Sequence, residues 1–276
     1  MKKKIGLIDL FIDEWHSNHL PEWIAASKRK DEFELAYAWE EAPFPGRRNL
    51  QEWCKDNNMI AARSIEEVVE NCDVISVLAP ANPEVHPRLA DIPLRSGKPV
   101  YVDKPFADSL AAAKGMFDLA EKYSTPLMTS SALRFCEEIQ SGKLHEMAPI
   151  LFNTLGGGRS FQEYAIHQLE MIVAVMGTDI RDIQLVGDSK KLSLALKYGN
   201  SRLATATYAV YFPFAISAAS ETNAVAYSTA TGYWDNFVNA LLDFFATGVS
   251  PIPKEQTLCI AEVLEKAVAL LQNARL

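Results

Sequence analysis

The first half of the chain alternates between two spacings of apolar residues. Short runs that are apolar almost throughout are typical of strands covered on both faces. Between them lie stretches whose apolar residues recur every three or four positions, as in amphipathic helices. Parallel strands need crossover connections of this length, so the alternation predicts a doubly wound parallel sheet of the α/β class in a first domain at residues 1–131. The predicted strands are Ile5–Ile8, Leu35–Trp39, Val74–Ala79, Val100–Val102 and Leu127–Thr129, and the predicted helices are Leu20–Lys28, Asn49–Asn57, Ser64–Asn71 and Asp108–Tyr123.

The second half of the chain groups its strands together instead of alternating them with helices. Strand-like runs follow one helical pattern, and two more helical patterns close the chain. This grouping predicts an α+β domain with a mainly antiparallel sheet at residues 132–276. The helical patterns are Phe161–Met176, Trp234–Ala246 and Lys254–Asn273, and the strand-like runs are Asp182–Val186, Lys191–Leu196, Leu203–Tyr211 and Asn223–Thr229.

Composition and charge exclude several classes of protein. With 49% apolar and 22% charged residues among 276, the chain is typical of a folded globular protein. Its net charge of −8 gives no basic field for nucleic acid or for an anionic membrane. The four cysteines are scattered without a C-x-x-C pair, which predicts neither a zinc site nor a disulfide framework and fits a reducing compartment. No run approaches the ~20 apolar residues of a membrane span, so we expect a cytoplasmic protein with no metal, nucleic-acid or membrane partner.

The first predicted strand enters a helical pattern through a turn that contains no glycine. The turn reads Asp9-Leu10-Phe11-Ile12-Asp13-Glu14. A strand, a tight turn and a helix begin many nucleotide-binding folds, where glycines let the backbone approach the ligand's phosphates. Here Phe11 is bulky, and three carboxylates place negative charge in the turn, which is unfavourable beside phosphates. The turn therefore has the position of a phosphate-binding loop but not its residue types.

A lysine lies where one strand of the predicted sheet ends. In the segment Lys98–Phe106 the strand ends at Asp103 and Lys104, because Pro105 prevents its continuation. Open parallel sheets bind ligands at the carboxyl ends of their strands. Lys104 is therefore a candidate site residue, with a solvated loop charge as the alternative.

A glutamate and a histidine share one face of a predicted helix. Glu163 and His167 are four residues apart, which places the carboxylate close enough to orient the imidazole. Such a pair is suited to general base catalysis. The alternatives are a surface i,i+4 contact or a core histidine whose ring nitrogen is satisfied. A metal would need at least one more ligand, which nothing nearby supplies.

A third segment, Val77–His86, is a strand that enters a loop rich in proline and polar groups. Pro80 and Asn82 are placed to present backbone and amide groups to a ligand at the edge of the sheet. The alternative is that both residues only form a turn.

Together these segments resemble one family, the Gfo/Idh/MocA oxidoreductases, over nearly the whole chain. Lys98–Phe106 is similar to the family's strand and Glu-Lys-Pro motif, with Asp103 in place of the glutamate. Thr129–Phe135 resembles the Gly-His-Asn-x-Arg-Phe segment that opens the second domain. Ala79–His86 resembles the Thr-Pro-x-x-x-His loop, and Gly156–His167 resembles the glycine-rich lead into an Asp-x-x-x-His motif. Each match is short, but their order and spacing together are specific.

The resemblance implies an NAD(P)-dependent oxidoreductase, with a Rossmann-type first domain, that acts on a hydroxyl of a sugar or polyol. His167 would remove the hydroxyl proton as hydride leaves the carbon for the nicotinamide. Lys104 would stabilise the developing alkoxide. Glu163 takes the position of the family's aspartate and would orient His167 or bind a substrate hydroxyl. These three residues are the implied catalytic set.

The resemblance also implies how the cofactor would be held. Glu40 falls where the family binds the adenosine ribose, which favours NAD over NADP. Arg47 and Arg48 follow closely and suit a 2′-phosphate, so NADP stays open. The implied cofactor-binding residues are Asp9, Leu10, Phe11, Ile12, Glu40, Ala79, Pro80, Asn82, His86, Asp103, Lys104 and Arg134.

The chain departs from the family in the first turn, where Asp9 and Phe11 fall at the first two glycine positions of Gly-x-Gly-x-x-Gly. Two interpretations follow. The protein is a divergent NAD(P)-dependent oxidoreductase, or it is a non-redox binding or regulatory protein that keeps the fold and has lost normal dinucleotide binding.

The resemblance further implies a homo-oligomer, a dimer or tetramer, through the second domain's sheet. Tyr208–Phe214 is a candidate interface strand, with ordinary sheet core as the alternative.

Overall fold

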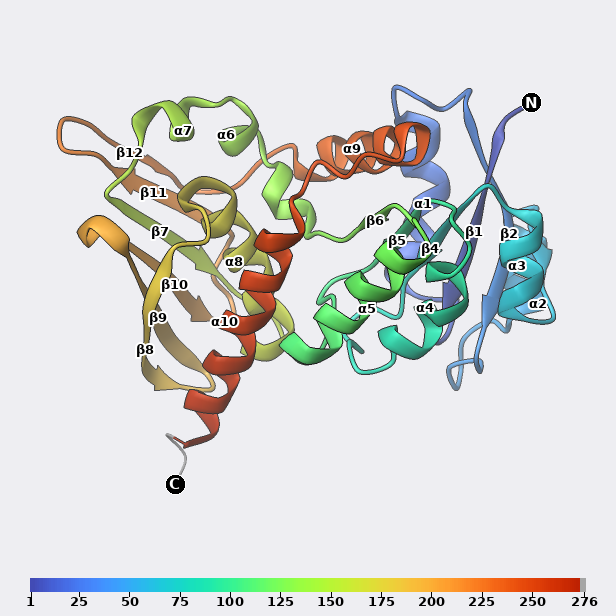
Figure 1. Cartoon of the computed structure of the whole chain (residues 1–276), viewed down its shortest axis with the longest axis horizontal. Helices are drawn as coiled ribbons and strands as arrows, with labels where there is room; N and C mark the ends of the chain where they lie inside the picture. The colour runs from blue at the N-terminus through green and yellow to red at the C-terminus, as the bar shows by residue number, and fades with distance from the viewer. Residues whose placement is uncertain (274–276) are drawn as a thin grey trace. The chain divides into compact units, whose positions relative to one another are not determined.

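The computed structural model describes residues 1–273 of the chain. They form two compact units, whose elements are labelled in Figure 1. The first unit comprises Met1–Thr129 and Val238–Pro253, and the second comprises Ser130–Phe237 and the residues from Lys254 on.

The segment Val238–Pro253 follows the second unit's sheet in sequence but belongs to the first unit. The sequence pattern assigns this segment to the second domain. In the structure Asp243 pairs with Arg29 at 2.5 Å, and the ring of Phe245 lies 6.3 Å from that of Phe33. Contacts between residues so far apart in the sequence cannot be predicted from the local spacing of apolar residues.

The first unit is built on a six-stranded sheet of order β3-β2-β1-β4-β5-β6, in which neighbouring strands are parallel. This confirms the predicted Rossmann-type sheet. The strands are β1 Lys3–Asp9, β2 Phe33–Glu40, β3 Ile60–Ala61, β4 Val74–Val77, β5 Val100–Val102 and β6 Leu127–Met128. The connecting helices are α1 Trp15–Ala26, α2 Leu50–Asp56, α3 Ile65–Asn71, α4 His86–Leu94 and α5 Leu110–Lys122.

The central strand β1 shows why these residues form a covered parallel sheet. Ile5, Leu7 and Ile8 are at most 2% exposed, as expected for a strand with helices on both faces. Gly6 lets α3 approach closely, since a Cβ there would lie 2.4 Å from Val68 Cγ1. The one glycine of this strand therefore serves helix packing.

Two helices of the first unit differ from the pattern-based prediction. Helix α1 begins at Trp15, five residues before the predicted start at Leu20, because Glu14 caps it. Helix α4 was not predicted, because its sequence holds two prolines. Pro87 lies in its first turn, where proline is tolerated, and Pro93 lies near its end.

The second unit contains a six-stranded sheet of order β12-β11-β7-β10-β9-β8. Only β7 and β10 pair in parallel, so the predicted mainly antiparallel sheet is confirmed. The strands are β7 Leu151–Gly156, β8 Ile180–Asp188, β9 Lys191–Tyr198, β10 Leu203–Ala209, β11 Ala215–Ala219 and β12 Ala224–Tyr227. The helices are α6 Glu137–Gln140, α7 Lys143–Met147, α8 Phe161–Met176 and α10 Lys254–Asn273, with 3-10 turns at Ala132–Phe135 and Gly199–Ser201. Helix α9, Tyr233–Thr247, begins in this unit and ends in the first.

Helices α8 and α10 cover one face of this sheet and enclose the second unit's core (Figure 1). The core side chains at most 1% exposed include Phe152, Phe161, Leu169, Met171, Ile172, Leu194, Leu196, Ala204 and Tyr208. Strands β7 and β11 were not predicted, since β7 contains Asn153 and β11 is mostly alanine, both poor strand formers. Both are nevertheless interior strands of the sheet.

Three further features concern the membrane, metal ions and the cysteines. No helix within residues 1–273 is long and apolar enough to cross a membrane. No group of three or more His, Cys, Asp or Glu side chains in this part of the chain is arranged to hold a metal ion. The cysteines are free, and Cys54, Cys72 and Cys136 are buried.

Candidate functional site

The carboxyl ends of four neighbouring strands lie along one edge of the first unit's sheet. Asp9 ends β1, Glu40 ends β2, Ala79 lies just beyond β4, and Lys104 lies just beyond β5. Ligands bind at this edge in open parallel sheets. The structure therefore brings together the site residues predicted from the first domain.

The carboxylate of Glu14 caps the helix that follows the first strand. Its Oε1 accepts the N–H of Ser17 at 2.6 Å, and its Oε2 accepts the N–H of His16 at 2.8 Å. The Ser17 hydroxyl in turn accepts the Glu14 N–H at 3.3 Å, which completes a capping box. Glu14 is 3% exposed. In doubly wound folds this helix start binds the cofactor's pyrophosphate, and here a carboxylate of the chain occupies it.

The carboxylate of Glu40 holds the first turn to the start of α2. One oxygen accepts the N–H of Ile12 at 2.9 Å, and the other accepts the N–H of Leu50 at 2.7 Å. Glu40 is buried. The resemblance implies that the Glu40 carboxylate binds the adenosine ribose, and both of its oxygens here accept backbone N–H groups.

Asp9 is fully buried at the end of β1, and only one of its oxygens is hydrogen bonded. Oδ1 accepts the N–H groups of Leu10 at 2.7 Å and Ala79 at 3.0 Å. Oδ2 has no hydrogen-bond partner among the described residues. Burial, and then repulsion by Glu14, raise the pKa of Asp9 well above its ordinary value, although its backbone bonds oppose the shift. Asp9 therefore keeps its proton to a higher pH than an ordinary aspartate.

We predict that Asp9→Asn raises the free energy of unfolding near neutral pH. An acid whose pKa is higher folded than unfolded contributes most stability below the unfolded value of about 3.9, and loses that contribution as the pH rises through the folded value. Asparagine keeps an acceptor oxygen for Leu10 and Ala79 and does not ionise. Urea unfolding at several pH values should show the variant's advantage shrinking toward acid pH. If the free energies of unfolding of the two proteins differ by the same amount at every pH, the raised pKa of Asp9 is contradicted.

The two arginines after β2 are engaged within the first unit. Arg48 pairs with Asp13 at 2.8 Å and with Asp56 at 2.9 Å, and its guanidinium holds the pKa of Asp13 below the usual range. The guanidinium of Arg47 lies 4.8 Å from the ring centre of Phe44 and 5.7 Å from that of Phe11. The charge of Asp13 in the first turn is therefore balanced internally.

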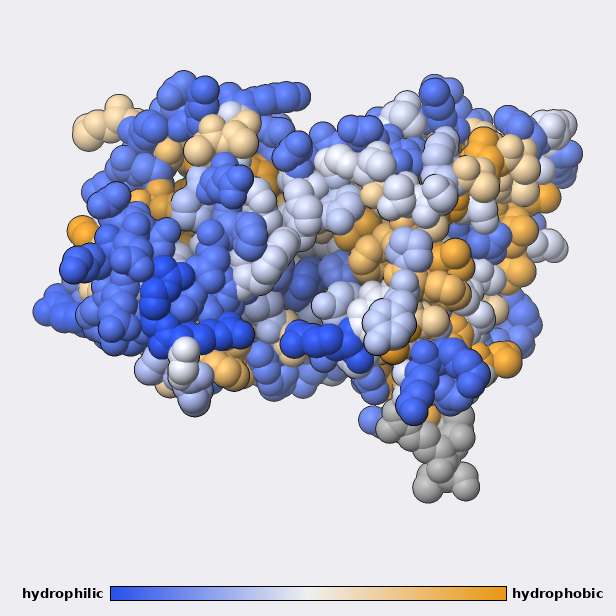
Figure 2. Space-filling view, turned by 180° about the vertical axis from the view of Figure 1, so that it is seen from behind, coloured by the Kyte–Doolittle hydropathy of each residue, from blue (hydrophilic) through white to orange (hydrophobic). Residues whose placement is uncertain are grey.

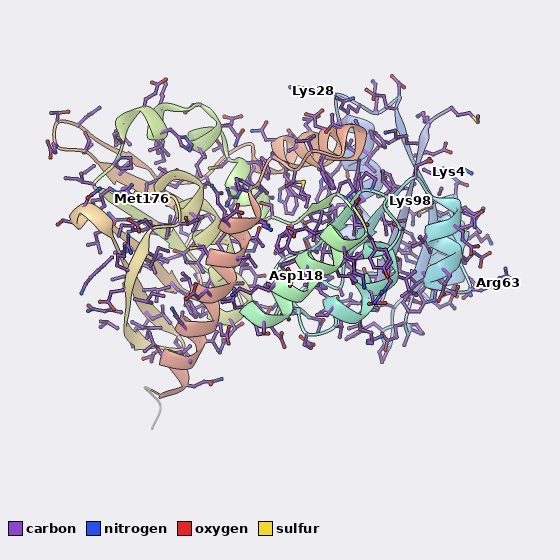
Figure 3. The ribbon with its side chains drawn as sticks, in the orientation of Figure 1. Lys4, Lys28, Arg63, Lys98, Asp118 and Met176 are labelled. Atoms are coloured by element: carbon purple, nitrogen blue, oxygen red, sulfur yellow. The ribbon has the colours of Figure 1, made fainter. Side chains whose placement is uncertain are left out.

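Lys104 lies at the carboxyl end of β5, beside a buried aspartate. Its Nζ is 4.0 Å from Oδ2 of Asp103, whose Oδ1 accepts the Tyr101 hydroxyl at 2.9 Å. Burial opposes ionisation of Asp103, yet the nearby charges of His16 and Lys104 and the Tyr101 hydroxyl hold its pKa below the ordinary value. Lys98, labelled in Figure 3, precedes β5 and donates to the Cys72 carbonyl at 2.7 Å. Of these two lysines, Lys104 is the one at the ligand-binding edge.

His86 fixes the loop after β4 to the segment after β5. Its ring is fully buried, with Nε2 2.7 Å from the Leu78 carbonyl and Nδ1 3.1 Å from the Phe106 carbonyl. Carbonyl oxygens only accept, so a ring nitrogen that bonds to one of them acts as the donor. Pro80 and Asn82 form the turn before it, and the Asn82 amide donates to a carboxylate two residues on at 3.2 Å. This loop is held in place around the edge of the sheet.

His167 lies in the second unit, on α8, and a serine hydroxyl binds its ring. Nδ1 of His167 is 2.6 Å from Oγ of Ser131, which also accepts the Leu133 N–H at 3.1 Å. The ring centres of Tyr164 and Phe214 lie 5.5 Å and 5.3 Å from the imidazole. The Ser131 hydroxyl thus helps to orient the imidazole, which two aromatic rings flank.

The glycine run before α8 makes room for those aromatic rings. A Cβ on Gly158, which has φ +151°, would lie 2.2 Å from the ring of Tyr164. A Cβ on Gly156 would lie 2.8 Å from the ring of Phe214. These glycines therefore permit the close packing around His167.

Glu163 lies in the first turn of α8 and takes part in its N-terminal cap. Its side chain accepts the Ser160 hydroxyl at 3.2 Å and pairs with Arg159 at 2.9 Å. Ser160 is the N-cap residue, so these contacts help to fix the start of the helix. The spacing to His167 is as the sequence predicted, and a role toward substrate stays a prediction.

Arg134 forms a buried ion pair with Glu170, one turn after His167. Its Nε donates to Oε2 of Glu170, and its Nη1 donates to the Gln256 side chain at 2.6 Å. Oε1 of Glu170 also accepts the N–H of Ser131 at 3.4 Å. This pair therefore supports the serine that binds His167.

Three residues of these sites were not identified as functional from the sequence. Glu14 with Ser17 three residues on is a capping box, but the pattern reverses the usual order of serine and glutamate. Counting back from Arg134, Ser131 stands at the histidine of the Gly-His-Asn-x-Arg-Phe segment. Glu170 gave no local signal, because its partner is 36 residues away.

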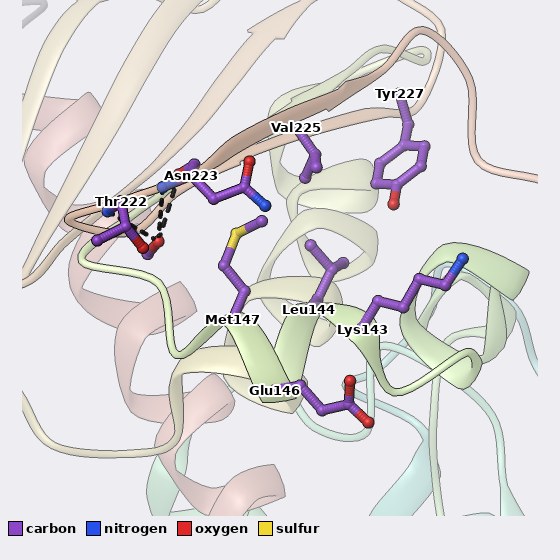
Figure 4. Close-up of a pocket in the computed structure, with 9 residues that line it drawn as sticks. Lys143, Leu144, Glu146, Met147, Thr222, Asn223, Val225 and Tyr227 are labelled. Atoms are coloured by element: carbon purple, nitrogen blue, oxygen red, sulfur yellow. Dashed lines mark hydrogen bonds between the residues drawn. The ribbon is translucent and has the colours of Figure 1, made fainter.

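A cavity of about 430 Å³ lies elsewhere in the second unit, between α7 and the β11–β12 hairpin (Figure 4). It contains none of the predicted site residues. Its lining residues are Lys143, Leu144, Glu146, Met147, Ser220, Thr222, Asn223, Val225 and Tyr227.

A nicotinamide dinucleotide fits this sheet edge only in part. Its pyrophosphate needs the N–H groups at the start of α1, and those of His16 and Ser17 bind Glu14. Its adenosine ribose needs the carboxylate after β2, and both oxygens of Glu40 bind backbone. With the Glu14 carboxylate in place, the pyrophosphate of a dinucleotide does not fit.

Part of the sequence matches a known protein family. Residues 14–131 match the Gfo/Idh/MocA profile, described as an oxidoreductase family with an NAD-binding Rossmann fold. Over 132 residues the chain is 28% identical to the uncharacterized oxidoreductase YhhX of Escherichia coli (strain K12). That match spans 41% of this chain and 38% of the relative's length. The family match begins at Glu14, so β1 and most of the first turn lie outside it.

The fold of the whole chain is that of solved dehydrogenases. A probable dehydrogenase from Thermotoga maritima superposes with a TM-score of 0.80 at 15% identity, covering 99% of this chain and 97% of that one. UDP-N-acetylglucosamine 3-dehydrogenase GnnA from Acidithiobacillus ferrooxidans gives 0.76 at 15% identity, covering 99% and 97%. An oxidoreductase from Agrobacterium radiobacter, solved with NAD+, L-tartaric acid and magnesium, gives 0.76 at 15% identity, covering 100% and 98%. At these identities the likeness shows a shared fold.

Sequence and fold point to the same group of proteins. The predicted resemblance is confirmed: residues 14–131 match the profile of the Gfo/Idh/MocA family of NAD-binding oxidoreductases, and the chain has the fold of solved dehydrogenases.

Proposed function

We propose that this chain is an oxidoreductase that interconverts a CH–OH group of a sugar or polyol and the corresponding carbonyl, with the nicotinamide cofactor that its family implies. The observation that carries the proposal is the imidazole of His167, bound by Ser131 at 2.6 Å and flanked by Tyr164 and Phe214. With the Nδ1 proton donated to Ser131, Nε2 is the basic nitrogen. It then takes the substrate's hydroxyl proton, as a general base does.

Lys104 supplies positive charge in this proposal. Its side chain is mostly buried at the carboxyl end of β5, and Asp103 and Tyr101 support that position. A cation beside the oxygen that loses its proton stabilises alkoxide character. Glu163 is proposed to bind a second hydroxyl of the substrate, or to orient His167 when the substrate is bound.

The substrate class rests on the family and on two structural relatives. One relative is described as a dehydrogenase of a nucleotide sugar, and another was solved with tartaric acid, a dihydroxy acid. General base chemistry at His167 suits a substrate with ionisable hydroxyls. A sugar or polyol is therefore the class to test first.

NAD is the proposed cofactor rather than NADP. Glu40 places a carboxylate at the end of β2, which disfavours a 2′-phosphate at that position. Arg48 pairs with Asp13 and Asp56, and Arg47 packs against Phe44. The two arginines are thus engaged within the chain instead of being available to a phosphate.

We also propose that the chain forms a homo-oligomer, a dimer or tetramer, through the uncovered face of the second unit's sheet. That face carries small polar side chains that bind one another, such as Asn153, which contacts Thr205 at 2.8 Å and Ser217 at 3.2 Å. Beside it the β10–β11 connection exposes Val210, Tyr211 and Phe212 by 39%, 95% and 40%. On the face turned away from the viewer of Figure 1, apolar residues gather over the second unit, on the right of Figure 2. Sedimentation of the purified chain tests this association.

A second candidate function is favoured by one observation. The Glu14 carboxylate holds the N–H groups that a pyrophosphate needs. A protein that keeps this arrangement permanently would bind a sugar or polyol without redox chemistry, as a binding or regulatory protein.

One titration separates the two functions. Melting temperature and nicotinamide fluorescence are followed as NAD, NADH, NADP or NADPH is added to the wild-type protein. A ligand at 100 times its Kd stabilises the fold by about 2.7 kcal/mol, which is easily measured. A response to one of the four, followed by turnover of a sugar or polyol, supports the oxidoreductase. No response at millimolar concentration to any of the four overturns it.

A further inference from the structure

The start of α1 holds a carboxylate of the chain in the position that a ligand phosphate takes in related folds. Both oxygens of Glu14 accept N–H bonds from the first helical turn, at 2.6 Å and 2.8 Å, and the side chain is 3% exposed. A phosphate group would use the same N–H groups and the same end of the helix dipole. The two anions cannot bind there together.

The surrounding contacts hold the backbone of the turn in place without using the Glu14 carboxylate. Glu40 binds the N–H of Ile12, and Arg48 binds the carboxylate of Asp13. The Ser17 hydroxyl contacts the Ile12 carbonyl. A change of side-chain rotamer at Glu14 would therefore free the N–H groups of His16 and Ser17 while leaving these contacts intact.

A second observation points to a ligand at this turn. Asp9 is fully buried, and its Oδ2 has no hydrogen-bond partner among the described residues. It lies near enough to Glu14 that repulsion contributes to the raised pKa of Asp9. A protonated Asp9 has a hydroxyl that can donate to a phosphate oxygen, a bond that an ionised carboxylate cannot make.

We propose that the Glu14 carboxylate occupies the cofactor's pyrophosphate position, so that a dinucleotide binds only by displacing it, and Glu14 sets the affinity of the chain for that dinucleotide. This inference rests on the proposed function, because it assumes that a dinucleotide is the ligand of this edge. It accounts for a first turn without glycine in a family of NAD-binding oxidoreductases. The Glu14 carboxylate of this turn competes with the phosphates for the N–H groups of His16 and Ser17.

The test compares two variants of Glu14 with one matched control. Glu14→Ser keeps a good N-cap while removing the anion, and Glu14→Gln keeps the size of the side chain without its charge. Glu22→Gln removes one charge from the exposed side of the same helix and leaves its N-terminus intact. Circular dichroism and melting temperature confirm that each variant is folded.

The binding of NADH and NADPH is measured by fluorescence titration, and inorganic pyrophosphate is used as a competitor. We expect both Glu14 variants to bind the preferred dinucleotide roughly 3- to 30-fold more tightly than wild type, the effect of losing a competing cap. Pyrophosphate should displace the dinucleotide from these variants at lower concentration than from wild type. Glu22→Gln should bind like wild type.

Several outcomes would overturn the inference. Equal affinity in wild type and both Glu14 variants would show that Glu14 does not compete. Absence of binding by both folded Glu14 variants at millimolar dinucleotide would show that the position is not a phosphate site. An equal gain in dinucleotide affinity in Glu22→Gln would mean that the effect comes from the lower net negative charge of the protein.

Failure of this inference can be told from failure of the proposed function. Tighter binding in the variants without turnover of any sugar or polyol would support the inference and overturn the oxidoreductase. Turnover by wild type, with unchanged dinucleotide affinity in the Glu14 variants, would support the oxidoreductase and overturn the inference.

Discussion

Replacing His167 with alanine is expected to lower kcat by about 10²- to 10⁴-fold for the best substrate of a sugar and polyol panel. General base catalysis contributes this much, and no other proposed residue supplies a basic nitrogen. KM should change little if the imidazole acts mainly in the transition state. Steady-state assays of nicotinamide reduction, with melting temperature as the check on folding, measure both effects.

Two variants sharpen the His167 prediction. Ser131→Ala should lower kcat less than His167→Ala and shift the pH–rate profile, because the serine acts by orienting the imidazole through its 2.6 Å contact. His145→Ala removes an exposed histidine of α7 in the same unit and should leave kcat unchanged. A His167→Ala protein that retains most of the wild-type kcat would remove His167 from the mechanism.

Replacing Glu170 with alanine is expected to lower the free energy of unfolding by about 3–5 kcal/mol. Glu170 is 3% exposed and accepts a bond from Arg134, which is 7% exposed. Removing one partner of a buried ion pair leaves the other charge uncompensated in a poorly hydrated place. Urea denaturation at pH 7 gives the difference, and a loss below about 1 kcal/mol would mean that water or Gln256 solvates Arg134.

A double variant separates the charge from the packing. Arg134→Met with Glu170→Leu replaces both charges by apolar side chains of similar size, which is often neutral or stabilising for buried pairs. It should recover much of the stability lost in Glu170→Ala. Because Glu170 also binds the Ser131 backbone, the double variant should remain impaired in turnover even when it is stable.

Much of the fold could be predicted, because local pattern and tertiary environment agree. The run Ile5–Ile8 reads as a strand covered on both faces, and β1 is the central strand of the sheet. The helical pattern of Phe161–Met176 has the bounds of α8, since Ser160 caps its start and Gly177 follows its end. Lys104 was placed correctly at the end of β5, because a proline directly follows.

The two unpredicted strands of the second unit depend on distant neighbours. Strand β7 contains Asn153, and its side chain is satisfied by Thr205 on β10, 52 residues away. Strand β11 is mostly alanine and pairs with β7 and β12 on either side. Local propensity argued against both strands, and sheet pairing outweighed it.

The candidate site shows the same limit. The residue types and their order allowed Lys104, Glu163 and His167 to be selected from sequence alone. The contacts that define their surroundings, such as Ser131 with His167, join segments that are far apart in the chain. In the first turn the sequence showed negative charge and no glycine, but only the structure shows that Glu14 caps α1.

The most direct test of the central claim is a hydride-transfer assay with isotopically labelled substrate. Wild type and Glu14→Ser are mixed with NAD or NADP and each member of a sugar and polyol panel, and reduced nicotinamide is followed over time. We predict that at least one member is oxidised, that deuterium at the reacting carbon slows its oxidation, and that His167→Ala slows it by about 10²- to 10⁴-fold. If neither protein reduces NAD or NADP with any member of the panel, the chain is not the oxidoreductase proposed here.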